Sequence, residues 1–270
     1  MTGSFRRLYL AVLALAAVAL VTTPVAARTL DEILASQTLR VGVNPTLPPL
    51  ALFDDQNELA GFDVDVATRI AEMLGVELEL VQVGSPDRIP FVASGRIDFV
   101  MGAMTRTSER AKVIDFTVPA HTEVFGVLTT EDRPYTDWRE LDSPEVTLVQ
   151  VRGTTPIAFI EENLPQAEVL LLDNYPDVIR ALSQGRGDAM LDVVDFVGEL
   201  MNRYDTAWKV VETPVSIYYC SLGVAKGNYT LRDWLNVALY DLHRTGFIDE
   251  TWRKWFGIDM IYPVQATPYF

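Results

Sequence analysis

Two groups of polar side chains stand where predicted strands end, and the groups carry opposite charges. Thr105 and Arg110 follow a strand expected over 97–101, whereas Asp192 and Asp195 follow the corresponding strand of the second half. An arginine can hold a carboxylate through two parallel hydrogen bonds, and an aspartate can accept from an ammonium group. The two groups together predict binding of a small zwitterion.

Each of these residues also has an ordinary structural explanation. Arg110 could form a surface salt bridge with Glu109 or Asp115, since most arginines are solvated. Asp192 and Asp195 could cap a helix that follows the strand, because aspartate is a common N-cap residue.

Further positions could line the same site. Thr154 and Thr155 follow Gly153 at the start of a predicted helix, where free backbone N–H groups can bind an anion. Threonine is equally an ordinary N-cap. Asn44 follows the first predicted strand, although asparagine before a proline is also typical of a turn.

The elements expected around these residues form two α/β halves. Hydrophobic periodicity, Gly stops and alternating stretches predict strands at 39–43, 76–83 and 97–101 and helices at 63–74 and 87–94. The second half repeats this order, with strands at 146–151, 168–172 and 188–193 and helices at 155–163 and 176–184. The alternation predicts an α/β fold with parallel sheets covered by helices.

An internal repeat links the halves. The residues of the first half recur at a constant displacement of 90 positions in the second: Pro86, Asp87, Ile89, Gly95, Arg96 and Asp98 match Pro176, Asp177, Ile179, Gly185, Arg186 and Asp188. By this repeat, Gly102 and Thr105 are analogous to Asp192 and Asp195. Chance similarity is the alternative, because helix–glycine–strand units follow ordinary capping rules.

Two extended stretches, 116–128 and 217–225, connect the halves, and helices are expected at 230–245 and 248–256. Such paired crossings predict a hinge between two lobes: residues 28–120 plus 219–270 form lobe 1, and residues 121–218 form lobe 2. Because open α/β sheets bind ligands beyond the carboxyl ends of their strands, we expect the site between the lobes.

The N-terminal segment has the pattern of a secretory signal. Arg6 and Arg7 precede an apolar run over 8–21, and residues 25–27 (Val-Ala-Ala) offer a cleavage site. A membrane anchor is the alternative, but such a run reaches only ~21 Å of the ~30 Å hydrocarbon core. We expect residues 1–27 to be cleaved and the mature chain to be soluble in the periplasm.

Composition excludes several classes of function. The formal charge is −15 over 270 residues, and so acidic a surface repels phosphate backbones, which excludes nucleic acid as a partner. The single cysteine, Cys220, excludes a disulfide and a Cys-rich metal site. With only His121 and His243 as histidines and no Gly-x-Ser-x-Gly, we expect no metal, no cofactor and no catalytic residue.

Several runs of residues resemble the polar amino-acid periplasmic binding proteins of ABC importers, solute-binding protein family 3. These runs are 61–65, 94–99, 104–110, 114–117, 153–155, 185–189 and 254–257. The resemblance implies a two-lobed type II fold with two hinge crossings that closes on one amino acid and delivers it to an inner-membrane ABC permease. We expect a monomer.

The resemblance also assigns roles. Arg110 and Thr105 would bind the ligand α-carboxylate with backbone groups at Ala103 and Thr155, and an aspartate after the strand at 188–191 would bind the α-ammonium. Gly102 is a further ligand-binding candidate. This sequence departs from the family where Val193 stands at the usual aspartate position, so Asp192 and Asp195 are both candidates. Leu47 and Leu50 stand where the family often has a stacking ring, and His121 also replaces an aromatic residue; Phe125 and Tyr218 are other possible walls.

Two alternatives to transport stay open at this point. Some proteins of similar fold are periplasmic cyclohexadienyl dehydratases, which need a general acid; Asp192 or Asp195 could serve only if burial raised its pKa. The chain could also be an accessory protein of a periplasmic redox enzyme that has lost ligand binding, because a fold does not fix a function.

Overall fold

A computed structural model describes residues 27–193 and 201–267. The predicted signal segment therefore lies almost wholly outside the described residues, and so does Asp195. Within the described ranges no helix is both long and apolar enough to cross a membrane.

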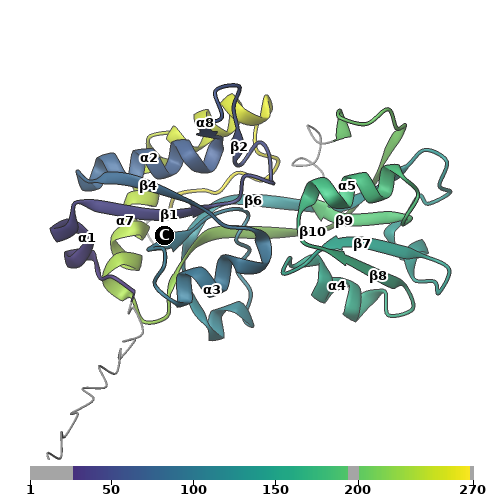
Figure 1. The fold of residues 1–270 in the computed structure, drawn as a ribbon, viewed down its shortest axis with the longest axis horizontal. Coiled ribbons are helices and arrows are strands. Elements are labelled where there is room, and N and C mark those ends of the chain that lie inside the picture. Colours follow the sequence, from purple (N-terminus) through teal and green to yellow (C-terminus); the bar gives the residue numbers. More distant parts are fainter. Residues whose placement is uncertain (1–26, 194–200, 268–270) are drawn as a thin grey trace, which may run out of the picture.

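The chain forms two α/β lobes joined by two long strands, as Figure 1 shows. The first lobe contains α1 (Leu30–Ser36), β1 (Thr38–Val43), the hairpin β2 (Leu52–Phe53) and β3 (Leu59–Ala60), α2 (Phe62–Leu74), β4 (Glu77–Gln82), α3 (Arg88–Ala93), β5 (Phe99–Val100), α7 (Tyr229–Arg244) and α8 (Phe247–Phe256). The second lobe contains β7 (Thr147–Val151), α4 (Pro156–Asn163), β8 (Glu168–Leu172), α5 (Tyr175–Ser183) and β9 (Ala189–Val193). The predicted α/β class and two-lobed fold are confirmed.

Short 3-10 helices complete the described elements: η1 (Ser85–Asp87), η2 (Arg110–Lys112) and η3 (Trp138–Leu141). The sequence analysis missed α1, although Thr29 and Glu32 form a capping box at its start. It also missed the β2–β3 hairpin, since two-residue strands are too short to show a period.

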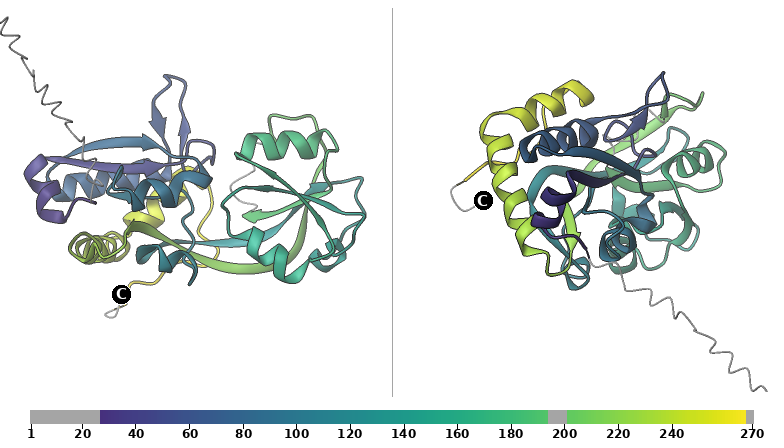
Figure 2. Two further views of the ribbon diagram at one scale, coloured as in Figure 1. Left: turned by 60° about the horizontal axis from the view of Figure 1, so that its bottom comes forward. Right: turned by 60° about the vertical axis from the view of Figure 1, so that its left-hand side comes forward.

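The connecting strands are β6 (Ile114–Thr130) and β10 (Trp208–Ala225), which pair antiparallel along most of their length. They run through the centre of one eight-stranded sheet whose order is β4-β1-β5-β10-β6-β9-β7-β8. Figure 2 shows them passing from one lobe to the other. The predicted lobe boundaries at 120/121 and 218/219 fall inside these two strands and stay a prediction.

The pairing of β6 with β10 is irregular beside Cys220, where the register shifts between Cys220 and Ser221 and again before Gly223. Such bulges strengthen the local twist and bend the strand that carries them. The strands are therefore bent close to the point where they pass between the lobes.

The internal repeat is visible in the hydrogen bonds. The Asp98 N–H donates to the Arg40 carbonyl over 2.8 Å, and the Arg40 N–H donates back to the Asp98 carboxylate over 2.7 Å. In the second lobe Asp188 makes the same two bonds with Thr147, both at 2.7 Å. In both lobes, the aspartate that precedes one strand (β5 or β9) is thus hydrogen-bonded to the start of another (β1 or β7).

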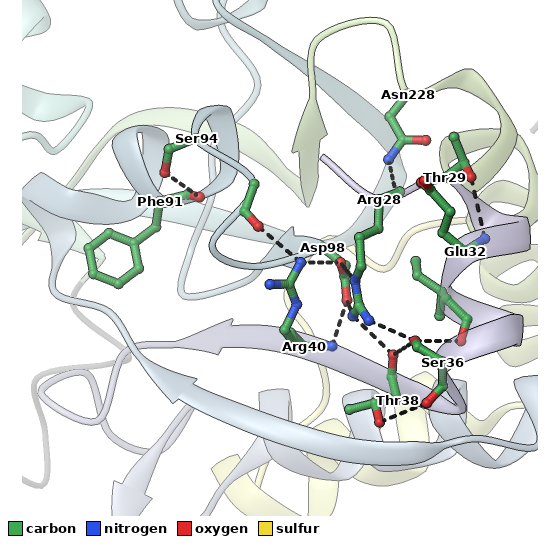
Figure 3. A network of polar contacts seen from close by, with 12 residues as sticks. Arg28, Thr29, Glu32, Ser36, Thr38, Arg40, Phe91, Ser94, Asp98 and Asn228 are labelled. Carbon is green, nitrogen blue, oxygen red and sulfur yellow. Dashed lines mark hydrogen bonds and ion pairs between the residues drawn. The ribbon is translucent and has the colours of Figure 1, made fainter. Parts of the chain in front are cut away.

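Asp98 is also the centre of an ionic network drawn in Figure 3. Its carboxylate is fully buried and contacts the guanidinium groups of Arg28 and Arg40. Arg28 donates further to Ser36 and to the Thr38 carbonyl. The residue that follows the predicted cleavage point is therefore fixed to the first lobe.

Candidate functional site

Arg110 lies where the two lobes meet. Its Nη1 atom donates to the Thr105 carbonyl in lobe 1 and its Nη2 atom donates to the Gly153 carbonyl in lobe 2, each over 2.9 Å. Glu109 pairs with Lys112, and Asp115 pairs with Lys226. The surface salt bridge offered as the alternative for Arg110 is therefore absent from the described contacts.

A second arginine, Arg88, converges on the same loop, and the sequence analysis missed it. Its side chain is buried and donates to the carbonyls of Gly102 and Ala103 and, over 3.5 Å, to that of Gly153. Burial lowers the pKa of Arg110 to about 10, and the Arg88 charge adds to this effect, so Arg110 is still a cation at neutral pH. Two cations thus face one loop of the second lobe.

Two acids balance these cations. Asp192, in β9, is buried, and its Oδ1 atom accepts from the Val193 N–H; the helix-cap alternative does not describe this contact. Burial raises the pKa of Asp192 to about 7, against the opposing effect of that N–H. Glu123, on β6, is also buried and interacts electrostatically with Asp192, with Cys220 and with Arg110.

We call these residues the interlobe site: Arg88, Thr105, Arg110, His121, Glu123, Tyr175, Asp192 and Cys220. Of the predicted residues, Arg110, Thr105 and Asp192 lie in this group, and their contact with a ligand stays a prediction. The structure adds Arg88, Glu123, Tyr175 and Cys220. Tyr175, the first residue of α5, is buried next to Asp192, and desolvation, together with the charge of Asp192 and a hydrogen bond to it, raises the pKa of the Tyr175 hydroxyl.

The turn after β5 belongs to the surroundings of this site, because Arg88 donates to its carbonyls. Gly102 and Ala103 both have left-handed backbone angles, with φ of 77° and 57°. The Gly102 N–H donates to the Asp63 carboxylate over 2.7 Å. Asp63 is fully buried at the start of α2, and desolvation raises its pKa to about 7, with the His121 charge opposing the shift.

The remaining predicted residues lie close to this turn or opposite it. Asn44 accepts from the Thr46 N–H, as expected for a turn, and its Nδ2 donates to Ser85 over 3.1 Å. Leu47 is fully buried in the hydrophobic core of the first lobe, and its contact with a ligand stays a prediction.

On the second lobe, the Thr154 hydroxyl donates to the Val151 carbonyl over 2.7 Å. Thr155 precedes α4, but its side chain makes no capping hydrogen bond. Its buried Oγ1 atom has no partner among the described residues, and the Oδ2 atom of Asp192 has none there apart from the interaction of its carboxylate with the Tyr175 hydroxyl. The capping alternative for Thr155 is therefore wrong, and its hydroxyl is left for another group.

A signal in the sequence could have found part of what was missed. His121 and Glu123 are spaced by two in an extended, otherwise apolar stretch, so they share one face of β6. A buried acid on such a face is rare unless it is paired or functional. Arg88 gives no comparable signal, because an arginine in the first turn of a short helix is usually solvated.

The arrangement places guanidinium groups and carboxylates in one site, which suits a small zwitterion, and the Cys220 thiol of the same site lies beside the His121 ring and the Glu123 carboxylate. Buried arginines favour a carboxylate, and buried acids favour an ammonium. Ligand binding by charge complementarity is the chemistry that these groups support.

Comparisons with known proteins agree with this interpretation. Residues 39–258 match the family of bacterial extracellular solute-binding proteins, family 3. The chain is similar to the glutamine-binding protein of an ABC transporter from Bacillus subtilis, with 31% identity over 209 residues, which cover 75% of this chain and 74% of that protein. It is also similar to a cyclohexadienyl dehydratase from Pseudomonas aeruginosa, with 30% identity over 193 residues, or 71% and 72% of the two chains.

Among solved structures, the chain resembles an ancestral amino acid-binding protein described as a precursor of cyclohexadienyl dehydratase. The TM-score is 0.78 at 30% identity, over 84% of this chain and 99% of that one. The family match, residues 39–258, includes every residue of the interlobe site. The protein is therefore a member of the bacterial extracellular solute-binding proteins, family 3.

Proposed function

We propose that this protein captures a small zwitterion, with an amino acid as the expected class, between its lobes in the periplasm and delivers it to an inner-membrane ABC permease. Its relatives include a glutamine-binding protein of an ABC transporter, which supports an amino-acid ligand. The proposal assigns the protein no catalytic activity and requires no oligomer.

The observation that carries the proposal is a pair of buried polar atoms on the second lobe. Thr155 Oγ1 lacks a hydrogen-bond partner among the described residues, and Asp192 Oδ2 has none there apart from the interaction of its carboxylate with the Tyr175 hydroxyl. An unsatisfied buried polar group costs about 1–3 kcal/mol. A ligand carboxylate at Thr155 and Arg110 would remove the penalty at Thr155, and a ligand ammonium would give the Asp192 carboxylate a charged partner.

The charges support a ligand without net charge. Arg88 and Arg110 face Glu123 and Asp192, so two cations stand against two acids. Leu47 and Leu50 stand where an aromatic ring would otherwise stack on an aromatic ligand. The loss of that stacking weakens binding of such a ligand by about 0.5–1.5 kcal/mol. We therefore expect small or aliphatic amino acids to bind better than aromatic ones.

The test is a ligand screen on the mature protein. Native mass spectrometry of the protein as purified shows whether a small molecule is retained, and thermal shifts with amino acids and small carboxylates identify its class. A rise in melting temperature with zwitterions at millimolar concentration supports the proposal. No shift with any zwitterion would contradict it and favour the accessory role beside a redox enzyme.

One observation favours a second candidate, a cyclohexadienyl dehydratase. That reaction needs a general acid, and burial raises the pKa of Asp192 to about 7, which suits such a group. A relative also carries this activity. Incubation with prephenate distinguishes the two: a binding protein leaves prephenate unchanged, whereas turnover that is lost in Asp192→Asn would establish the enzyme.

A further inference from the structure

Three side chains that can ligate a metal meet on the two connecting strands. His121 on β6 lies directly opposite Cys220 on β10, and Glu123 follows two residues along β6 on the same face. The side chains are buried, with exposed fractions of 3%, 1% and 3% for His121, Cys220 and Glu123. A nitrogen, a sulfur and an oxygen donor thus come together inside the protein.

We propose that His121, Glu123 and Cys220 bind one divalent transition-metal ion, with Zn²⁺ the ion that best fits this donor set. Imidazole, thiolate and carboxylate are the ligands that zinc takes in proteins, whereas Ca²⁺ and Mg²⁺ prefer oxygen alone. Three protein ligands leave a fourth position for water or for a ligand held between the lobes.

The distances suit such a centre. The His121 Nε2 and Glu123 Oε1 atoms are 3.4 Å apart, and the donor atoms of all three residues lie within 4.8 Å of one another. Zinc bonds of about 2.0–2.3 Å in a tetrahedron place two ligand atoms about 3.3–3.7 Å apart. One pair already has this separation, and the others need to close by at most about 1.5 Å.

The surroundings restrain the three donors to different degrees. The His121 ring packs against Phe62 and Trp252, each with ring centroids 5.5 Å from its own. The Cys220 Sγ atom lies 3.9 Å from the Thr105 hydroxyl. The ring contacts restrict His121 most, so the closing movement that an ion requires has to come mainly from Glu123 and Cys220.

The charge around the site also permits a divalent ion. Desolvation and the Glu123 charge raise the pKa of the Cys220 thiol, so the ion has to displace its proton; the resulting thiolate and the Glu123 carboxylate together then neutralise a divalent ion. The positive charges of Arg110 and Arg88 repel the ion, but both guanidinium groups are directed toward backbone carbonyls, to which they donate hydrogen bonds. The sequence analysis expected no metal because the chain has one cysteine and two histidines, whereas the pairing of β6 with β10 brings one of each together with Glu123.

The test uses Co²⁺ as a spectroscopic probe and Zn²⁺ as its competitor. The mature protein, reduced and freed of metal by a chelator, is titrated with Co²⁺. We expect an intense thiolate-to-cobalt absorption band that saturates at one ion per chain and disappears when Zn²⁺ is added. Since Cys220 is the only cysteine, such a band can come from no other residue.

Variants identify the other ligands. His121→Gln and Glu123→Gln should each lower Zn²⁺ affinity at least about 100-fold, because even outer-sphere partners of a metal contribute about 10–100-fold. The matched control is His243→Gln, which removes the other histidine of the chain and should leave affinity unchanged. Melting temperatures without metal show whether each variant is folded.

The proposal fails if Co²⁺ at saturation gives no thiolate band with the unaltered protein, a result that needs no variant to fold. It also fails if folded Cys220→Ser binds Zn²⁺ as tightly as the unaltered protein. The titration contains no amino acid, so its outcome is independent of the transport proposal. The amino-acid screen, repeated in chelator, tests that proposal separately.

Discussion

Arg110 and Gly153 belong to different lobes, and the Arg110 Nη2 atom donates to the Gly153 carbonyl over 2.9 Å. A guanidinium has five N–H donors, so Arg110 can keep its contacts with Thr105 and Gly153 and still donate to a ligand carboxylate. One side chain can therefore bind the ligand and hold the lobes together.

Arg110→Ala should weaken ligand binding strongly. Removing one partner of a desolvated charge pair costs ~2–5 kcal/mol, and at ~1.4 kcal/mol per tenfold the affinity should fall at least ~30-fold. Arg110→Lys should rescue poorly, because lysine lacks the planar fork. Isothermal titration calorimetry with the best amino acid of the screen measures both, and an unchanged affinity in Arg110→Ala would refute this role.

Asp192→Asn should change the preferred ligand. The variant should lose affinity for amino acids, because the ammonium loses its charged partner, but should still bind the matching deaminated acid. Asp195→Asn is the parallel variant, and only one of the two is expected to show this effect. Thermal shifts with both ligands measure the change; if neither variant affects amino-acid binding, the ammonium partner lies elsewhere.

Gly153→Ala should hinder closure of the lobes. Gly153 has φ of 78°, and an added Cβ would lie 3.0 Å from the Pro86 Cα atom and 3.1 Å from the Ser85 carbonyl oxygen in the other lobe. The affinity should fall by at least about tenfold, or ~1.4 kcal/mol. Small-angle scattering at saturating ligand should give a larger radius of gyration than for the unaltered protein.

Gly185→Ala is the matched control for this variant. Gly185 also has a left-handed φ, 67°, but an added Cβ would meet nothing within 4 Å. The substitution should cost about 1–2 kcal/mol of stability through backbone strain and leave ligand affinity unchanged. Equal affinity losses in the two variants would show that strain, not the contact between lobes, causes the effect.

The pH dependence of stability should include a contribution from Asp63. Its folded-state pKa of about 7 lies above the unfolded value of about 3.9, so the folded state binds more protons between these values. Stability from this group is present below about pH 4, falls as the pH rises and levels off above about 7.

Asp63→Asn should remove this slope. Asparagine keeps an oxygen that can accept from the Gly102 N–H, so the variant should gain on the order of 2–4 kcal/mol over the unaltered protein between pH 4 and pH 8. Urea denaturation at several pH values measures the difference. Parallel curves for the two proteins would contradict the raised pKa.

Asp98→Asn should be among the most destabilising single changes in the first lobe. Asp98 is fully buried between Arg28 and Arg40, and removing one partner of a buried ionic network costs about 3–5 kcal/mol. Its counterpart Asp188 is 12% exposed and pairs with Arg133 alone, so Asp188→Asn should cost less, about 1–3 kcal/mol. Denaturant midpoints compare the two; a reversed order would contradict this ranking.

Much of the fold could be predicted because it depends on local patterns. The predicted helices over 63–74 and 176–184 agree with α2 and α5 within about one residue at each end, since apolar spacing and glycine stops define both. Arg110 could be chosen as a candidate site residue on similarly local grounds, because it lies in a run that resembles a known family.

The rest of the site depends on contacts between distant segments. Arg88 reaches the Gly153 carbonyl across 65 positions, and Cys220 lies opposite His121 only because β6 pairs with β10. No spacing in the sequence encodes either contact. The order of strands in the sheet was also beyond local patterns, since it depends on which edges of β6 and β10 are left for β5 and β9.

The single sheet has a consequence for how the chain unfolds. β5 pairs with β10, β10 with β6 and β6 with β9, so the hydrogen-bond ladders of the two lobes are continuous. Unfolding either lobe would remove a paired strand from β6 or β10, which the other lobe also uses, and would leave backbone groups of that strand unpaired. We therefore expect the two lobes to melt as one cooperative unit, in a single transition.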